Sequence, residues 1–281
     1  MLPWVYEFRW DLGHIIFLGV FYSVVILIAF TLVRALIRAI RDFKNHRVDH
    51  IMWQATFEDL PTPVRACRHE LSGEVANRTC PNEFDCRECR THELFLRKNP
   101  ASPGGTTPRA SGEEQLFGLS FPLDRYYDRG HTWVQPDKDG TVKVGLNDLG
   151  ARLIGSVENV QLPVIGSRLE VHGTAWHVTR GGADTRILSP IEGTVVEVGG
   201  PGKGWYLKVR PEGMETAVRH LLRGAEIKPW LTRELERLQF ALSADGVGMS
   251  LADGGVPVED LPKSSPKTDW DAVWGEMFLE A

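Results

Sequence analysis

The chain has 281 residues, of which 42% are hydrophobic and 25% charged, as in an ordinary folded protein with one or two modest domains. Its formal net charge is −5, so it lacks the basic excess with which proteins displace counterions from nucleic-acid phosphates. We therefore exclude a general role in nucleic-acid binding.

An uncharged apolar run occupies residues 15–33, IIFLGVFYSVVILIAFTLV. As a helix it would be about 28 Å long, close to the thickness of the hydrocarbon core of a bilayer. A cleaved signal peptide would carry its basic residues before the run, whereas here they follow it. A buried core helix is the other alternative, but the pattern favours a transmembrane helix over residues 15–33.

The basic residues around this helix predict its orientation. Only Arg9 precedes it, and five basic residues follow within fifteen positions: Arg34, Arg38, Arg41, Lys44 and Arg47. The positive-inside rule then predicts a single-pass protein of the inner (plasma) membrane. Residues 1–14 would form a short extracytoplasmic tail, and the C-terminal domains would be cytoplasmic. Residues 34–58 predict a basic juxtamembrane helix against anionic membrane lipid, with a simple solvated helix as the alternative.

All four cysteines lie in one segment, residues 59–98. Cys67, Cys80, Cys86 and Cys89 form the pattern C-x12-C-x5-C-x2-C. Stable disulfides are disfavoured in the cytoplasm, and the C-x2-C spacing lets two thiolates reach one ion, so the pattern predicts a metal site. A structural Zn²⁺ is the leading interpretation; an iron–sulfur cluster and unmetallated, redox-active thiols are the alternatives.

Residues 99–114, NPASPGGTTPRASGEE, have the composition of a flexible linker, which would leave the domain after it free to reorient. Strand-like alternation follows over residues 115–212. Two β-branched runs there are separated by Arg180, Gly181, Gly182, Ala183 and Asp184. Because Gly-Gly supplies the positive φ angles of a tight turn, these runs predict a protruding β-hairpin.

Six sequence blocks lie on both sides of this hairpin, in a fixed order. They are His131-Thr132-Trp133, residues 144–148, Leu153-Ile154-Gly155, residues 160–166, Ser189-Pro190 with Gly193, and residues 204–209. Over residues 126–211 this order resembles the glycine cleavage H-protein family. The resemblance implies a mainly β fold with accessory α-helices, the lipoyl-like barrel-sandwich hybrid. We expect its core to include Val160, Leu162, Leu169, Val171, Val196 and Val198.

The hairpin tip departs from the family. In the family a tip lysine carries lipoate, and an ungapped count back from Pro190 puts Gly182 at that position. No lysine lies between Lys143 and Lys203, and the guanidinium of Arg180 is a poor acyl acceptor. We therefore expect no lipoate, and a tip of Arg180, Gly181 and Gly182 that binds a protein partner instead.

Helices are predicted again after the barrel, over residues 213–243, where Leu231, Leu235, Leu238 and Leu242 form a helical stripe. Residues 244–267 are rich in Gly, Pro, Ser and Asp and predict a disordered linker. Residues 268–281 predict an amphipathic tail helix. Its apolar face, with Trp270, Trp274 and Phe278, would dock either onto the barrel or into a partner's groove.

We find no catalytic motif with a convincing context and expect a protein that is not an enzyme. The leading hypothesis is a membrane-anchored, non-lipoylated adaptor with a cysteine metal site, binding cytoplasmic or membrane proteins. One alternative is an iron–sulfur electron-transfer subunit of a membrane redox complex. The other is a lipoyl carrier of the glycine cleavage system.

Overall fold

The computed structural model of the protein describes residues 11–44, 57, 60, 62, 64–87, 89–98, 112–243 and 257–279. The chain divides into two compact units, residues 1–54 and residues 55–281, which we describe separately. Most of the predicted N-terminal tail, the second half of the predicted juxtamembrane helix over residues 34–58, and most of the two predicted linkers lie outside the described residues. These are residues 1–10, 45–56, 99–111 and 244–256.

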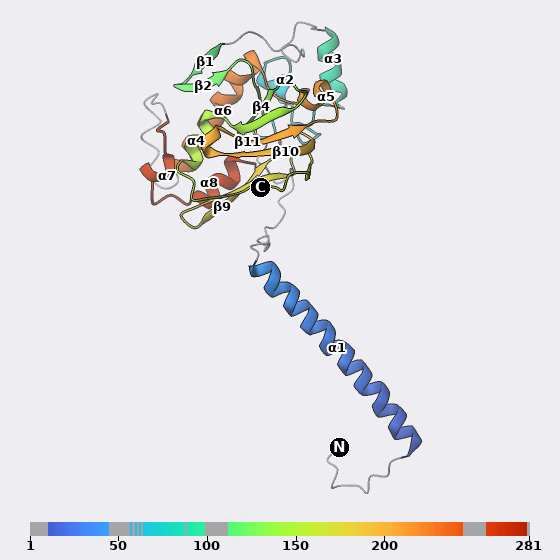
Figure 1. The fold of residues 1–281 in the computed structure, drawn as a ribbon. Helices are drawn as coiled ribbons and strands as arrows, with labels where there is room; N and C mark the ends of the chain where they lie inside the picture. The colour runs from blue at the N-terminus through green and yellow to red at the C-terminus, as the bar shows by residue number, and fades with distance from the viewer. Residues whose placement is uncertain are drawn as a thin grey trace. The chain divides into compact units, whose positions relative to one another are not determined.

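The first unit is one long helix, α1 (Leu12–Lys44), shown in blue in Figure 1. Its part from Leu12 to Arg34 is 23 residues long, has a mean hydropathy of 2.7 and is long and apolar enough to cross a membrane. The helix begins before the predicted span and continues into the basic segment after it. Side chains such as Phe17, Ile26 and Leu32 are exposed along it, so nothing in the described part of this unit covers the apolar span.

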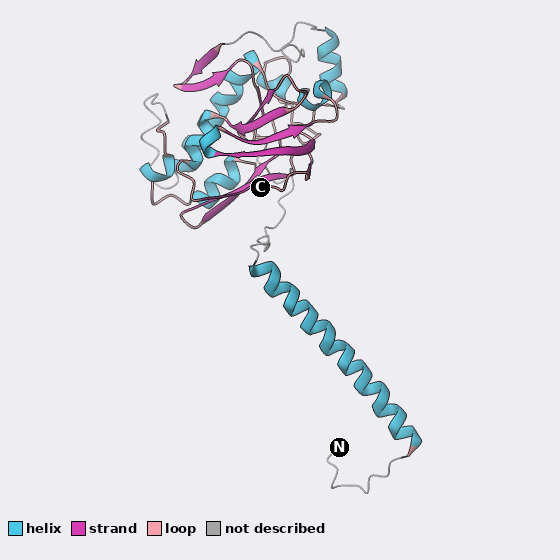
Figure 2. Ribbon diagram, viewed as in Figure 1, coloured by secondary structure: helices cyan, strands magenta, loops and turns pink. Residues whose placement is uncertain are grey.

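The second unit is mainly β with accessory helices, as predicted (Figure 2). A six-stranded sheet has the order β3-β4-β5-β11-β10-β7, a three-stranded sheet the order β6-β8-β9, and β1 pairs with β2. The strands are β1 (Glu113–Leu116), β2 (Leu119–Pro122), β3 (Tyr126–Tyr127), β4 (Thr132–Pro136), β5 (Val142–Leu146), β6 (Asn159–Gln161), β7 (Arg168–Leu169), β8 (Thr174–Arg180), β9 (Ala183–Leu188), β10 (Gly193–Gly200) and β11 (Trp205–Arg210). All neighbouring strands within these sheets are antiparallel.

The described part of this unit also contains helices. They are α2 (Arg68–Leu71), α3 (Arg90–Lys98), α4 (Asp148–Ile154), α5 (Met214–Val218), α6 (Ile227–Ser243), α7 (Leu261–Ser264) and α8 (Trp270–Met277), with two 3-10 turns, η2 (Pro201–Lys203) and η3 (Gly224–Glu226). The predicted stripe on α6 is confirmed, because Leu231, Leu238 and Leu242 are buried and Leu235 packs against the core.

Close packing of Trp133 fixes the pairing of β4 with β5. The residue lies opposite Gly145, where a Cβ atom would stand only 2.5 Å from the indole ring. The indole Nε1 donates a hydrogen bond to the Leu146 carbonyl oxygen at 2.7 Å. A side chain at position 145 would therefore displace the indole and disturb the centre of the six-stranded sheet.

The predicted core is only partly correct. Leu169 is buried, whereas Val171 and Val196 are half-buried. A register shift between Val195 and Glu197, where β10 pairs with β11, changes which residues face inward. Val195 is buried where Val196 was expected to be, because a bulge reverses the inward and outward alternation on which the prediction relied.

Residues 257–267 are ordered, which corrects the prediction of a disordered linker through position 267. They contain α7, in which Leu261 is buried, and Asp260 caps this helix by accepting a hydrogen bond from the Lys263 amide at 3.0 Å. The predicted linker over residues 99–114 also ends earlier than expected, because β1 begins at Glu113.

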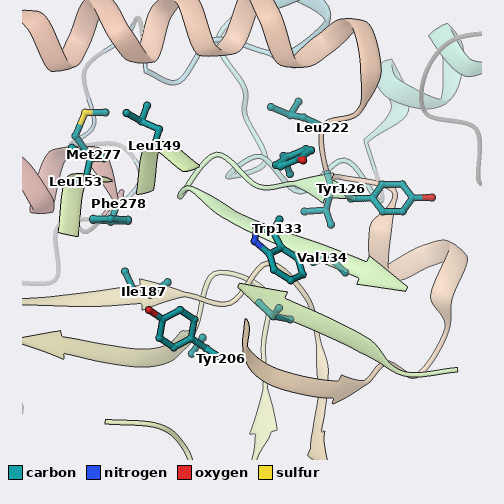
Figure 3. Packing of buried hydrophobic residues seen from close by; sticks show 14 of the residues in the cluster. Tyr126, Trp133, Val134, Leu149, Leu153, Ile187, Tyr206, Leu222, Met277 and Phe278 are labelled. Carbon is teal, nitrogen blue, oxygen red and sulfur yellow. The ribbon is translucent and has the colours of Figure 1, made fainter. Parts of the chain in front are cut away.

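The tail helix α8 docks within its own chain. It lies against β9 and α6 (Figure 1), and Figure 3 shows Met277 and Phe278 beside Leu149 and Leu153 of α4. Trp270 is 8% exposed, Trp274 1% and Phe278 0%. The expectation that these side chains form a partner-binding face is therefore corrected, because the barrel already covers them.

We predict that Trp274→Ala destabilises the second unit by about 3–5 kcal/mol, the usual cost of deleting a buried aromatic side chain. The indole of Trp274 also donates a hydrogen bond to the Leu153 carbonyl oxygen at 2.9 Å, which the variant loses. Thermal unfolding of the full chain in detergent, followed by near-ultraviolet circular dichroism, measures the change. The control is Ile165→Ala, at a side chain 58% exposed, which should change stability by less than about 0.5 kcal/mol. Equal losses of unfolding free energy in Trp274→Ala and Ile165→Ala would show that the tail does not dock as described.

Candidate functional site

The predicted hairpin is confirmed. Strands β8 and β9 pair from Thr174↔Leu188 up to Arg180↔Ala183, which leaves Gly181 and Gly182 as the turn. Their φ angles are 60° and 85°, as a two-residue hairpin turn with two positive φ angles requires. Both glycines are exposed, and a Cβ atom at either would have nothing within 4 Å. The tip is therefore open to solvent on the described part of the chain.

Arg180, next to the tip, is bound inside the chain. Its Nη1 donates to the Ile154 carbonyl oxygen at 2.6 Å and to Asp260 Oδ1 at 2.8 Å, and its Nη2 donates to Asp260 Oδ2 at 3.1 Å. The side chain is only 15% exposed. The expectation that Arg180 binds a partner as part of the tip is thus corrected, because Asp260 already pairs with its guanidinium.

Gly155 makes room for this ion pair. It follows the last residue of α4 with a φ of 65°, and a Cβ atom there would come within 2.2 Å of Arg180 Nη1 and 2.4 Å of Asp260 Oδ1. Both the positive φ and the close approach therefore require glycine at this position. A helix end, the hairpin and the tail thus meet at one point.

The surroundings of Asp260 favour its charged form. Burial alone would raise the pKa of this carboxyl group, but hydrogen bonds from Arg180, the Lys263 amide and Ser156 hold the pKa well below its ordinary value. A second contact, a hydrogen bond, joins the tail helix α8 to the hairpin near the same place. The Asp184 amide donates to Asp271 Oδ1 at 3.0 Å. Arg180, Asp260 and Asp271 therefore form what we call the hairpin clamp.

The cysteine segment begins with a short backbone pairing. Ala66 and Thr79 form an antiparallel bridge, the Cys67 amide donates to the Arg78 carbonyl oxygen at 2.8 Å, and the Cys80 amide donates to the Arg65 carbonyl oxygen at 2.7 Å. The first two cysteines thereby lie on neighbouring backbone segments that are joined by this bridge. The Cys89 amide donates to the Cys86 carbonyl oxygen at 3.3 Å, which closes the C-x2-C turn.

Three of the four thiols are buried: those of Cys67, Cys80 and Cys86. Cys89 is half-buried, and all four are free. Burial raises the pKa of the Cys86 thiol to about 11, against the opposing influence of Arg68 and Arg129. Within the described residues, no three His, Cys, Asp or Glu side chains form a group that could hold a metal ion. The metal site over these cysteines stays a prediction.

Arg129 reaches into this segment from the loop before β4. Its Nη1 donates to the Ala66 carbonyl oxygen at 2.6 Å, and its guanidinium lies 4.1 Å from the centroid of the Phe84 ring. The side chain is buried, and burial lowers its pKa, whereas the thiols of Cys86, Cys80 and Cys67 act to raise it.

Arg68 ties the segment to the chain that follows the barrel. It forms two hydrogen bonds with Glu226, from Nε to Oε1 at 2.8 Å and from Nη2 to Oε2 at 2.6 Å. It also donates to the carbonyl oxygens of Arg219 and Leu221. Burial alone would lower the pKa of Arg68, but Glu226 and the Cys86 thiol raise it. The cysteine segment is therefore packed onto the barrel rather than free to reorient.

The sequence did not reveal Asp260, Arg129 or the Arg68–Glu226 pair as parts of a site. These residues meet partners 63 to 158 positions away in the chain. Asp260 lies in a Gly- and Pro-rich segment, and Arg129 lies beside one of the family blocks. Neither setting contains a local sequence pattern that identifies a contact with a distant residue. The one available signal was Gly155, which the sequence blocks included without indicating what packs against it.

We predict that Asp260→Asn weakens the hairpin clamp and lowers the free energy of unfolding by about 1–3 kcal/mol, the usual value for hydrogen bonds to charged groups. Asparagine can still cap α7, so the change removes mainly the charge opposite Arg180. Thermal unfolding measures the effect. The control is Glu197→Gln, which breaks the exposed pair with Lys203 at 3.4 Å and should cost less than about 1 kcal/mol. An equal effect of the two variants would refute the clamp.

The same clamp predicts a pH dependence. Because the folded pKa of Asp260 lies below its ordinary value of about 3.9, the stability it contributes is present above that value and is lost as pH falls towards the folded pKa. The difference in stability between the wild type and Asp260→Asn should therefore shrink below about pH 4. Parallel unfolding curves at pH 7, 5 and 3.5 test this, and a difference that is constant with pH would contradict it.

Comparison with known proteins identifies the barrel. The family model described as "Glycine cleavage H-protein" matches residues 125–234. Glycine cleavage system H protein 2 of Pseudomonas syringae is 31% identical over 121 residues, which cover 39% of this chain and 94% of that protein. The H protein of Rhodospirillum rubrum is 35% identical over 98 residues, 30% of this chain and 78% of that protein. A crystal structure of an H protein from Mycobacterium marinum has 26% identity and a TM-score of 0.34, covering 40% of this chain and 98% of its own. Through its barrel-sandwich domain, the chain belongs to the glycine cleavage H-protein family.

Proposed function

We propose that this protein is a membrane-anchored, non-lipoylated member of the H-protein family that acts as an adaptor for other proteins and not as an enzyme. The observation that carries this proposal is the hairpin tip. The exposed turn residue Gly182 stands where the family resemblance places the lipoyl lysine, and no lysine occurs from residue 144 to residue 202. Without a side-chain amine the tip has no group on which lipoate could form an amide.

The contacts that hold the strands behind the tip support a binding role. Gly181 and Gly182 are exposed, while the hairpin clamp fixes the strands behind them. A surface that is already ordered loses less conformational entropy on binding than a mobile one. The relatives are named as parts of a glycine cleavage system, which supports other proteins as the partners.

Helix α1 supports the membrane anchor. Its span from Leu12 to Arg34 is apolar up to Val33; Arg34 ends it, and Arg38, Arg41 and Lys44 follow. By the positive-inside rule this arrangement favours a cytoplasmic second unit. The adaptor would thus hold its barrel at the cytoplasmic face of the inner membrane, with lipid in contact with α1.

A metal site in the cysteine segment forms part of the proposal. Cys67, Cys80, Cys86 and Cys89 would hold Zn²⁺, and the closed C-x2-C turn between Cys86 and Cys89 supports this. The alternative for the same thiolates is an iron–sulfur cluster, which would make the protein an electron-transfer subunit. Iron with acid-labile sulfide in anaerobically purified protein would favour that alternative.

A lipoyl carrier is the second candidate function, because the family resemblance implies it. It requires an amine near the tip. Lys203, the nearest lysine on the C-terminal side, lies in η2 rather than in the hairpin, and its Nζ contacts Glu197 and the Trp205 ring. The geometry therefore favours the adaptor.

We predict that the protein from its native host, or expressed together with a lipoylation system, carries no lipoyl adduct. Intact-mass spectrometry of the full chain measures this directly. The control is a related H protein that keeps its tip lysine, expressed in the same cells, which should be modified. Stoichiometric lipoylation of the wild-type chain would overturn the adaptor proposal and restore the carrier.

A further inference from the structure

Three arginines from different elements hold the tail, residues 257–279, to the rest of the second unit. They are Arg152 of α4, Arg180 of β8 and Arg237 of α6. Arg180 pairs with the Asp260 carboxylate, and the other two donate hydrogen bonds to the backbone carbonyl oxygens of Pro257 and Glu276. The tail carries five acidic residues and two lysines, so its charge complements these guanidinium groups.

Helix α8 supplies the apolar half of the same contact. Trp274 is buried, and its indole donates to the Leu153 carbonyl oxygen at 2.9 Å. Met277 and Phe278 lie beside Leu149 and Leu153 (Figure 3). Recognition of an amphipathic helix by another protein uses the same combination of apolar anchors and flanking polar contacts. We call the surface formed by the three arginines with the two leucines of α4 the tail-binding face.

The tail meets this face as one contiguous segment. It contributes no strand to the sheets of the described residues, and it follows α6 through residues 244–256, which are rich in Gly and Asp. Its contacts are made by side chains and backbone groups of the kind that a bound peptide offers. The face therefore holds the tail as it would hold a separate helix.

The tail fills the face imperfectly. Arg237 Nε lies 3.7 Å from Glu276 Oε1, too far for a hydrogen bond, and has no hydrogen-bond partner among the described residues. The hydroxyl of Thr268 is likewise buried without a partner there. Because an unpaired buried polar group weakens a contact, another helix with an acceptor near Arg237 Nε and an apolar group in place of the hydroxyl would bind more tightly.

We propose that the tail-binding face is a recognition site for an acidic amphipathic helix of another protein, and that the chain's own tail occupies it until such a helix displaces it. This inference rests on the adaptor role in the proposed function and adds the chemistry of the partner. The partner carries carboxylates opposite Arg180 and Arg237 and aromatic residues spaced as Trp270, Trp274 and Phe278. The tethered tail then acts as a competitor that excludes weaker helices.

The test uses the full chain in detergent with a protease site placed within residues 244–256. Cleavage after purification leaves the tail bound without a covalent link. The probe is a fluorescent synthetic peptide of residues 257–281, and its binding is followed by fluorescence anisotropy. The peptide should bind the cut protein and should bind the uncut protein at least about tenfold more weakly, because a tethered tail competes at a millimolar effective concentration.

Variant peptides test the chemistry of recognition. Asp260→Asn should weaken binding to the cut protein by roughly tenfold or more, as the loss of hydrogen bonds to a charged group usually does. Glu259→Gln is the matched control, because it removes the same charge from the neighbouring, exposed side chain, and it should leave the affinity unchanged. Thr268→Val removes the unpaired hydroxyl and should raise the affinity severalfold above that of the natural tail.

Three outcomes would overturn the proposal. A peptide that fails to bind the cut protein, or equal affinities of the Asp260→Asn and Glu259→Gln peptides, would remove the site. A Thr268→Val peptide that binds no more tightly than the natural tail would show that the tail is not the weaker ligand. Co-purification of two differently tagged, uncut copies would identify a second copy as the partner. The lipoylation measurement is independent of all three, since a lipoyl adduct would overturn the adaptor without changing peptide binding.

Discussion

The ion pair between Arg180 and Asp260 fixes the hairpin to the rest of the barrel. The guanidinium of Arg180 also donates a hydrogen bond to the Ile154 carbonyl oxygen at the end of α4. Cations are favoured at such a helix end by the helix dipole and by unpaired carbonyl groups. Gly155 must lack a side chain for this contact to form. The hairpin that carries the lipoyl arm in the family is here held against a helix end and the C-terminal tail.

A second guanidinium contact joins the other added segment to the barrel. Arg129 binds the backbone beside Cys67, and Arg68 binds Glu226 after the barrel. In the family domain the hairpin thus contacts the C-terminal tail, and the loop before β4 contacts the cysteine segment. In both places a buried or half-buried arginine supplies several donors in fixed directions, which suits contacts between segments distant in sequence.

The sequence predicted the features that have local causes. Gly181 and Gly182 specified the turn through their freedom at positive φ, and the leucine spacing of α6 specified its buried face. Features set by distant partners were missed. The composition of residues 257–267 indicated disorder, yet Asp260 and Leu261 anchor them through contacts with Arg180 and the core. The bulge beside Val195 similarly depends on pairing with β11 and has no signal of its own.

Hydrogen–deuterium exchange of the intact chain, read by mass spectrometry, tests most directly whether the hairpin has become a fixed surface. Peptides covering Thr174–Leu188 and residues 257–279 should be protected together, and both should exchange faster in the Asp260→Asn variant. A hairpin that exchanges as rapidly as an unstructured segment, while the tail stays protected, would contradict the account. The tip would then be a mobile arm that has merely lost its lysine.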